Sequence, residues 1–233
     1  MITGIKDETQ AKKAFELGAD AIGLLPFDNI ISPEKAASIT RNLPDNAQTV
    51  LVTHLTNAQE IAELASKTGV TTIEICESVL PQEIKGIKNR LSGVKIIKVI
   101  SVADNSSVES VMKDVERFMH HVDAIELDTF NPATGRTGGT GKPHDWNISK
   151  EVVRKHGKRI PIILAGGLTL DNVSLALQTV EPFGLNVSSS VMSNHILDEK
   201  KLEAFLLAAG AQARGIEPRQ NLAKSHGAGR GVS

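Results

Sequence analysis

The sequence predicts an α/β fold, a single (β/α)8 TIM barrel, and two repeating patterns carry this prediction. Segments with apolar residues at helical spacing alternate with short, β-branched apolar runs. Eight such runs occur, at 2–5, 20–25, 49–54, 71–76, 94–101, 124–128, 160–167 and 184–190. Eightfold strand–helix alternation in a chain of 233 residues is the pattern of this barrel. An open doubly wound sheet is the alternative, but its usual GxGxxG turn is absent after the first run.

The predicted helices lie between these runs, each with an apolar stripe that would pack on the sheet. In chain order the stripes fall at 11–17, 36–43, 61–65, 84–91, 108–119, 152–153, 173–180 and 202–206. Three helix starts carry capping signals: Ser32 before Pro33, Asn57, and Thr169.

Composition limits the class of protein and its partners. The chain has 26 basic and 27 acidic residues, and this balance gives no electrostatic reason to expect nucleic acid or an anionic membrane. Aromatic residues make up only 3%, so we expect an aliphatic core. A single cysteine, Cys76, excludes a disulfide within the chain and disfavours a cysteine-based metal site. No apolar stretch is long enough to cross a bilayer, so we expect a cytoplasmic protein. We also expect that it binds no metal and that it is either a monomer or a homodimer.

The predicted barrel domain covers residues 1–212, and residues 213–233 differ from it. This segment is rich in Gly, Arg and polar residues and lacks an apolar pattern. We expect a flexible C-terminal tail. The alternative is that its basic residues contact an acidic ligand or partner.

Residues 124–146 are the most informative segment of the chain. An apolar run ends in Asp128, and a loop follows that contains Gly135, Gly138, Gly139 and Gly141. A carboxyl group at the C-terminal end of a barrel strand, covered by a glycine-rich loop, can deliver a proton to a bound ligand. The alternative is that the acid only caps a helix, as Asp145 would do before Trp146.

Two neighbouring strand ends predict a phosphate site. The seventh run ends in Gly166 and Gly167, and the eighth ends in Ser188, Ser189 and Ser190. Glycines let backbone N–H groups approach an anion, and hydroxyl groups add donors. The loops after strands seven and eight form this site in many barrels. A tight turn without a ligand would also explain the two glycines.

Polar residues within the strands predict a cluster inside the barrel. The two-residue period places Glu74 with Cys76, and Glu126 with Asp128. If these faces point inward, Lys98 is the expected partner of Glu74 and Glu126. The alternative is that one or more of the three point outward. His54 ends the third run and could reach the site or be structural.

Several segments together resemble the phosphoribosylanthranilate isomerases of tryptophan biosynthesis. They read LDTFNPATGRTGGTGKPHDW (127–146), PIILAGGLTLDNV (161–173) and PFGLNVSSSV (182–191), with looser similarity in 2–25 and 31–39. The resemblance implies a cofactor-free (β/α)8 barrel. It also implies an Amadori rearrangement of N-(5-phosphoribosyl)anthranilate to the 1-amino-1-deoxyribulose 5-phosphate.

The resemblance also implies roles for individual residues. Asp128 corresponds to the general acid that opens the ribose ring. Gly166, Gly167 and 188–190 correspond to the phosphate site, where the family usually has Gly at the position of Ser190. Asn29, Cys76 and Gly139 fall at substrate-contacting positions.

The chain departs from the family where the general base should lie. The KICGI motif, whose cysteine removes the C2′ proton, reads Met1-Ile2-Thr3-Gly4-Ile5 here. Thr3 is a far weaker base than a cysteine thiolate. Asn29 replaces an arginine and Cys76 a histidine. Cys76 and His54 are possible substitute bases. The alternative functions are an enzyme for another phosphorylated sugar and a non-catalytic phosphosugar-binding barrel.

Overall fold

A computed structural model describes residues 1–27, 30–131, 135–137 and 141–210. Eight parallel strands form one curled sheet in the order β1-β2-β3-β4-β5-β6-β8-β9. They are β1 (Ile2–Thr3), β2 (Ala21–Leu24), β3 (Gln48–Thr53), β4 (Thr72–Ile75), β5 (Lys95–Val102), β6 (Ala124–Asn131), β8 (Ile162–Leu164) and β9 (Gly184–Leu185). All eight predicted strands therefore exist. The predicted tail, 213–233, lies outside the described residues.

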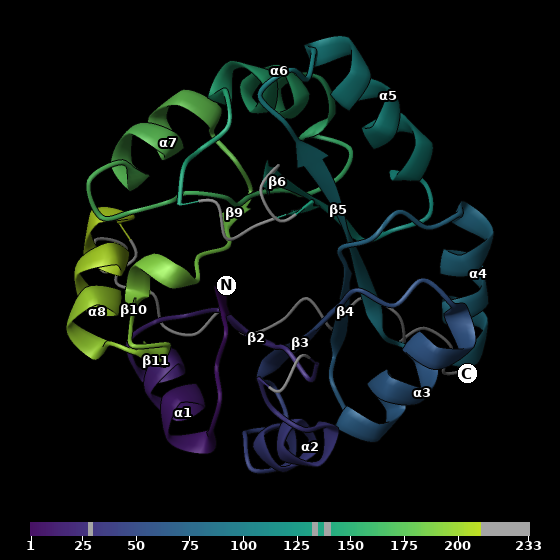
Figure 1. Cartoon of the computed structure of the whole chain (residues 1–233), viewed down its shortest axis with the longest axis vertical. Coiled ribbons are helices and arrows are strands. Elements are labelled where there is room, and N and C mark those ends of the chain that lie inside the picture. Colours follow the sequence, from purple (N-terminus) through teal and green to yellow (C-terminus); the bar gives the residue numbers. More distant parts are fainter. Residues whose placement is uncertain (28–29, 132–134, 138–140, 211–233) are drawn as a thin grey trace, which may run out of the picture.

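Helices follow one another around the outside of this sheet (Figure 1). They are α1 (Glu8–Glu16), α2 (Pro33–Arg41), α3 (Ala58–Thr68), α4 (Pro81–Arg90), α5 (Val108–Phe118), α6 (Trp146–His156), α7 (Val173–Val180) and α8 (Glu199–Ala208). Among the described residues, none of these helices is both long and apolar enough to cross a membrane.

Short elements that we did not predict lie near the strand ends. They are β7 (Arg136–Thr137), the 3-10 helix η1 (Ser189–Val191), β10 (Met192–Ser193) and β11 (Ile196–Leu197). β7 pairs antiparallel with the end of β6, so the strand that carries Asp128 continues into a hairpin.

Side-chain caps explain two predicted helix starts and correct the third. Ser32 accepts a hydrogen bond from the Lys35 N–H, and Asn57 accepts from the first turn of α3. Thr169 does not begin a helix. Its own N–H donates to Asn172 Oδ1 at 2.8 Å, and α7 starts only after Asn172. The Asn172 side chain closes a turn over residues 169–172 by accepting this hydrogen bond, and the helix begins only after that turn.

The core between the sheet and the helices is aliphatic, as the composition predicts. Fully buried side chains include Ile22, Leu51, Ile73, Ile125 and Leu164, one from each of five strands. They alternate along each strand with residues on the opposite face of the sheet. That opposite face carries the polar residues of the site.

The residues that follow the last strand of the sheet order lie beside the first strand. A parallel bridge joins Ile2 to Val187, where the Thr3 N–H donates to the Val187 carbonyl at 2.9 Å. The Val187 N–H donates to the Met1 carbonyl at 3.2 Å. Residues 1–3 therefore lie beside residues 186–188.

Candidate active site

Strand register places the acidic residues on one face of the sheet. Glu74 pairs with Ile97, Val99 with Glu126, and Ser101 with Asp128. Paired residues of neighbouring strands point to the same side, and every second residue returns to it. Glu74, Glu126 and Asp128 therefore share one face, as their two-residue spacing predicts.

A hydrogen bond across the sheet identifies this face as the concave one. Asn186 Nδ2 donates to both carboxylate oxygens of Glu126 at 3.1 Å. Glu126 lies on β6 and Asn186 follows β9, while β8 lies between them in the sheet order. Side chains on non-adjacent strands can meet only across the inside of the curled sheet.

Thr3 joins this buried network. Its hydroxyl donates to Asn186 Oδ1 at 2.8 Å, and both side chains are buried. Burial raises the pKa of Glu126 well above its ordinary value, assisted by the neighbouring charges of Glu74 and Asp128. Asn186 thus connects the residue at the expected base position with a carboxyl group that we did not assign to the site. The sequence did offer one sign of Asn186, because it is a polar residue within the predicted strand 184–190.

Glu74 and Cys76 form a second inner pair. Glu74 is only 3% exposed, and its Oε1 accepts a hydrogen bond from Cys76 Sγ at 3.8 Å. Its Oε2 is buried and has no hydrogen-bond partner among the described residues. Burial, with the nearby charge of Asp128, raises the pKa of Glu74 to about 8. Cys76 is half-buried at the end of β4, and burial raises the pKa of its thiol well above the usual value.

Lys98 does not join the acidic residues, so the hypothesis of an inner Glu74–Lys98–Glu126 cluster is wrong, and the alternative that at least one of the three points outward is confirmed. Lys98 pairs with Ile75 in the register and therefore faces the helices, opposite to Glu74. It is 3% exposed, and its ammonium group donates to the carbonyls of Ile75, at 3.2 Å, and Val99. The nitrogen lies 5.7 Å from the centroid of the Phe118 ring on α5, and burial lowers the pKa of Lys98 to about 8.

Asp128 lies at the C-terminal end of the sheet, where a ligand could reach it. Burial raises the pKa of its carboxyl group to about 6, although a 2.7 Å hydrogen bond from the Thr129 N–H opposes this shift. The next strand approaches it closely. A Cβ at Gly166 would lie 2.7 Å from Asp128 Oδ1 and 2.2 Å from Thr129 Oγ1.

The end of the β6 loop is fixed by a buried hydrogen-bonded chain. Thr129 Oγ1 lies 3.0 Å from His144 Nδ1, and His144 Nε2 lies 2.6 Å from Ser149 Oγ on α6. Burial lowers the pKa of His144 to about 4, so the ring is neutral near pH 7. Asp145 caps α6 by accepting from the Asn147 N–H. Thr129 was not predicted to have this role, and no pattern in the sequence marks it.

The predicted phosphate residues lie on neighbouring strand ends. Gly166 and Gly167 follow β8 with φ values of 84° and 62°. No other described residue accepts a hydrogen bond from either N–H. Ser188 and Ser189 are exposed, and Ser190 Oγ is a buried atom without a hydrogen-bond partner within the described part of the chain. α7 begins only at Val173, and Asn172, which precedes it, donates its side-chain amide to the Gly167 carbonyl at 2.9 Å.

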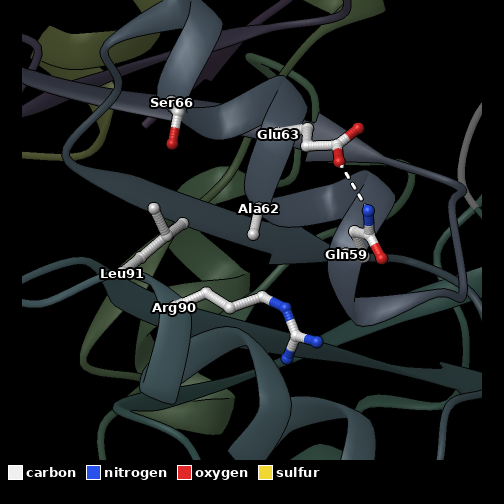
Figure 2. Close-up of a pocket in the computed structure, with 6 residues that line it drawn as sticks. All are labelled: Gln59, Ala62, Glu63, Ser66, Arg90 and Leu91. Carbon is white, nitrogen blue, oxygen red and sulfur yellow. Dashed lines mark hydrogen bonds between the residues drawn. The ribbon is translucent and has the colours of Figure 1, made fainter.

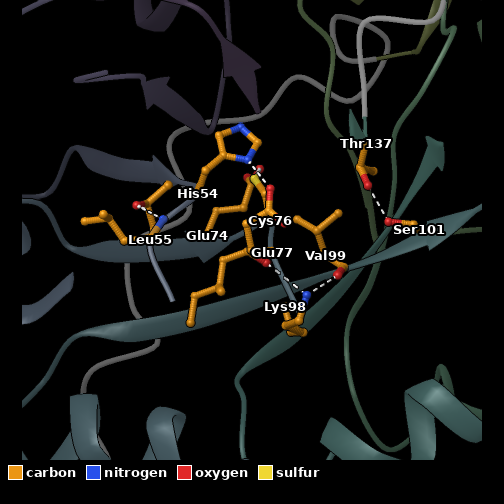
Figure 3. A network of polar contacts seen from close by, with 11 residues as sticks. His54, Leu55, Glu74, Cys76, Glu77, Lys98, Val99, Ser101 and Thr137 are labelled. Carbon is orange, nitrogen blue, oxygen red and sulfur yellow. Dashed lines mark hydrogen bonds and ion pairs between the residues drawn. The ribbon is translucent and has the colours of Figure 1, made fainter. Parts of the chain in front are cut away.

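The predicted strand-end histidine contacts a carboxyl group at the rim of the same face. His54 Nδ1 lies 2.8 Å from Glu77 Oε1, and both side chains are partly exposed (Figure 3). Phe27 packs edge-on against the imidazole ring, with centroids 5.0 Å apart. The figure also shows Glu74 and Cys76 beside this pair, and the contact of Ser101 with Thr137.

Two predicted substrate contacts, Asn29 and Gly139, lie outside the described residues. Within the described ranges, no group of three or more His, Cys, Asp or Glu side chains could hold a metal ion.

An open surface hollow of about 480 Å³ lies away from the strand ends, between α3 and α4 (Figure 2). Its lining includes Gln59, whose Nε2 donates to Glu63 Oε1 at 2.8 Å, and Arg90, which donates to the Gly86 carbonyl. All its lining residues lie on or directly after these two helices, and none lies on a strand. We assign no part of the reaction to it.

Comparisons with known proteins show the family to which this chain is similar. The model of the N-(5'-phosphoribosyl)anthranilate isomerase family matches residues 1–208. A Methanosarcina mazei protein, N-(5'-phosphoribosyl)anthranilate isomerase 2, is 36% identical over 88% of this chain and 91% of its own length. The solved isomerase from Pyrococcus furiosus superposes with a TM-score of 0.74 at 30% identity, covering 89% of this chain and 96% of that one. A further solved isomerase, 25% identical with a TM-score of 0.71 and the same coverage, contains reduced 1-(o-carboxyphenylamino)-1-deoxyribulose 5-phosphate.

Proposed function

Because the chain belongs to the N-(5'-phosphoribosyl)anthranilate isomerase family, we propose specific residues for the reaction of that family in tryptophan biosynthesis. This reaction is an Amadori rearrangement, and it needs a general acid, a general base and a binding site for the phosphate group. The single observation that carries the assignment is the position of Asp128, a half-buried carboxyl group near the C-terminal end of β6 and directly beside the turn at Gly166.

Asp128 is the general acid. It protonates the ring oxygen of the ribose, so that the bond from C1′ to that oxygen breaks and the amine nitrogen forms an iminium with C1′. A general acid works best when its pKa lies near the working pH. The pKa of about 6, caused by burial, leaves a useful protonated fraction near neutrality, which an exposed aspartate would not have.

Gly166, Gly167 and 188–190 hold the 5′-phosphate. The N–H groups of the two glycines and the hydroxyl of Ser190, which have no acceptor or partner among the described residues, supply donors of the kind an anion needs. The strands that carry these two turns are direct neighbours, because Leu164 pairs with Leu185.

Thr3 is not the general base. Its hydroxyl proton is donated to Asn186, and an alcohol ionises only at very high pH. Its remaining acceptor capacity suits a substrate hydroxyl group instead. Asn29, Cys76 and Gly139 remain predicted contacts with the substrate.

The scaffold for this site is a closed (β/α)8 barrel over residues 1–212. The bridge between Ile2 and Val187, which links the two ends of the sheet order, supports closure. A cytoplasmic location, a tail at 213–233, and a monomeric or homodimeric state remain predictions from the sequence.

Turnover of freshly generated phosphoribosylanthranilate, followed by loss of anthranilate fluorescence, tests the function. We expect the wild type to be active and Asp128→Asn to lose about 10²–10⁴ in kcat, the usual contribution of one general acid. The exposed Asp104→Asn is the matched control and should keep wild-type activity. A folded but inactive wild type would contradict the function, and an active Asp128→Asn would contradict the role of the acid.

A further inference from the structure

The reaction needs a base for the C2′ proton, and we propose that Cys76 and Glu74 supply it together, with the Cys76 thiol contacting the substrate. This proposal rests on the proposed function. It assigns a second proton-transfer site on β4, two strands away from Asp128 on β6.

Other described groups on the inner face are poor candidates. Thr3 donates its hydroxyl proton to Asn186. Both oxygens of Glu126 accept from Asn186, and the side chain is 1% exposed. His54, at the rim, is engaged with Glu77. Cys76 is different because it is half-buried at a strand end, so a ligand can touch it, and a proton acceptor lies directly beneath it.

Glu74 is that acceptor, and its own surroundings are unusual. A buried carboxyl group normally finds hydrogen-bond partners for its oxygens, and each exception calls for an explanation. Glu74 is 3% exposed, yet only the Cys76 thiol is bound to Oε1 and nothing described is bound to Oε2. Burial raises the pKa of Glu74 to about 8, so the ionised form, which is the one able to accept a proton, makes up a growing fraction as the pH approaches 8. A carboxylate with a raised pKa is a stronger base than an exposed one, and this suits it to take the proton of the neighbouring thiol.

The proton transfers can be balanced. The thiol proton passes from Sγ to Glu74 Oε1, which leaves a thiolate. The thiolate removes the C2′ proton, the C–H electron pair forms the C1′=C2′ bond, and the iminium electrons return to nitrogen. The enaminol becomes the ketone when its hydroxyl proton passes to the Asp128 carboxylate. C1′ then takes the proton held by Glu74, delivered through Sγ, and both groups regain their starting state.

Because Cys76 is the single cysteine, the pair can be tested by mutation and by alkylation. We expect Cys76→Ala and Glu74→Gln each to lower kcat by about 10²–10⁴, the range for one proton-transfer group. The kinetic isotope effect on kcat from deuterium at C2′ should be larger for Glu74→Gln than for the wild type, because removal of the C2′ proton becomes fully rate-limiting in the variant. A merely structural role of Glu74 would not raise this isotope effect.

Alkylation tests the same pair without a mutation that could disturb folding. Iodoacetamide should inactivate the native enzyme at Cys76, and reduced 1-(o-carboxyphenylamino)-1-deoxyribulose 5-phosphate should protect it. Glu74→Gln should react more slowly, since Glu74 no longer takes the thiol proton. Glu77→Gln, on the same strand end but paired with His54, is the matched control and should match the wild type in turnover and alkylation rate.

The outcomes separate this proposal from the proposed function. An active wild type with Cys76→Ala within twofold of it, or with full activity after alkylation, would overturn the pair and leave the function standing. A wild type with no turnover would overturn both.

Discussion

Thr3 illustrates how one hydrogen bond can set the chemistry available to a side chain. Its hydroxyl donates to Asn186 Oδ1 at 2.8 Å, and Asn186 in turn donates to Glu126. The amide is therefore held with its oxygen toward β1 and its nitrogen toward β6. This buried chain explains why a polar residue at position 3 is tolerated without serving as a base.

Replacing Thr3 tests the value of that bond. Thr3→Val keeps the shape but leaves the buried Asn186 oxygen without its donor, so we expect a loss of about 1–3 kcal/mol in the free energy of unfolding. Thr3→Ser keeps the hydroxyl group and removes only a methyl group, so its loss should be about 1 kcal/mol or less. Urea denaturation of the three proteins measures both. Equal stability of Thr3→Val and the wild type would show that the bond contributes nothing.

At the scale of elements, the turn after β8 packs tightly against the end of the loop that follows β6. Gly167 has φ = 62°, and a Cβ there would lie 2.1 Å from the Lys142 carbonyl carbon and 2.2 Å from the Pro143 nitrogen. Backbone atoms cannot move aside as a flexible side chain can. Gly167 therefore packs the turn after β8, where we propose the phosphate binds, against the end of the loop that follows β6.

Gly167→Ala should reveal this contact when it is compared with Gly69→Ala. Gly69 has a similar φ of 67°, but a Cβ there would meet only Thr40 Cγ2 at 3.8 Å. Gly69→Ala should cost about 1–2 kcal/mol from left-handed strain alone. Gly167→Ala should cost about 1–3 kcal/mol more, because overpacking adds to strain. Urea midpoints measure the difference, and equal losses would mean that the loop does not press on Gly167.

Strand register also marks the limit of what the sequence could predict. The two-residue period correctly placed Glu74 with Cys76 and Glu126 with Asp128 on one face. It could not relate one strand to the next, so it left open whether Lys98 points inward toward the acidic residues or outward toward the helices. Only the pairing of Lys98 with Ile75 shows that it faces α5. The predicted helix start at Thr169 was wrong for a similar reason. The sequence pattern did not show that the Asn172 side chain would bind the Thr169 N–H, so that the helix begins only after Asn172.

At the scale of the whole molecule, eightfold alternation was enough to predict the strands and their parallel order, and the low aromatic content was enough to predict the aliphatic core. The site was harder, because its residues come from separate strands. Asp128 and the two glycines lie in local motifs, and these motifs led us to propose them as site residues. The link from Thr3 through Asn186 to Glu126 spans 183 positions between its first two members, and no local pattern contains it.

The concave face holds three carboxyl groups, and this should give the molecule an unusual pH dependence of stability. Burial raises the pKa of Glu74 to about 8, that of Asp128 to about 6, and that of Glu126 well above its usual value. The folded state therefore holds protons that the unfolded chain releases above about pH 4.5. The stabilising contribution of these groups is complete below that pH and is lost as the pH rises through the folded-state values.

Comparing the wild type with Glu74→Gln isolates one of these groups. The glutamine side chain in the variant does not titrate. His144, Lys98 and the Met1 amino group, whose pKa values are lowered by burial, are present in both proteins. Between pH 5 and 8 the variant should gain stability relative to the wild type by up to about 1.4 kcal/mol per pH unit. Urea unfolding at several pH values within this range measures the gain. A constant difference would mean that Glu74 ionises as freely in the fold as in water, and the acceptor proposed beneath Cys76 would lose its physical basis.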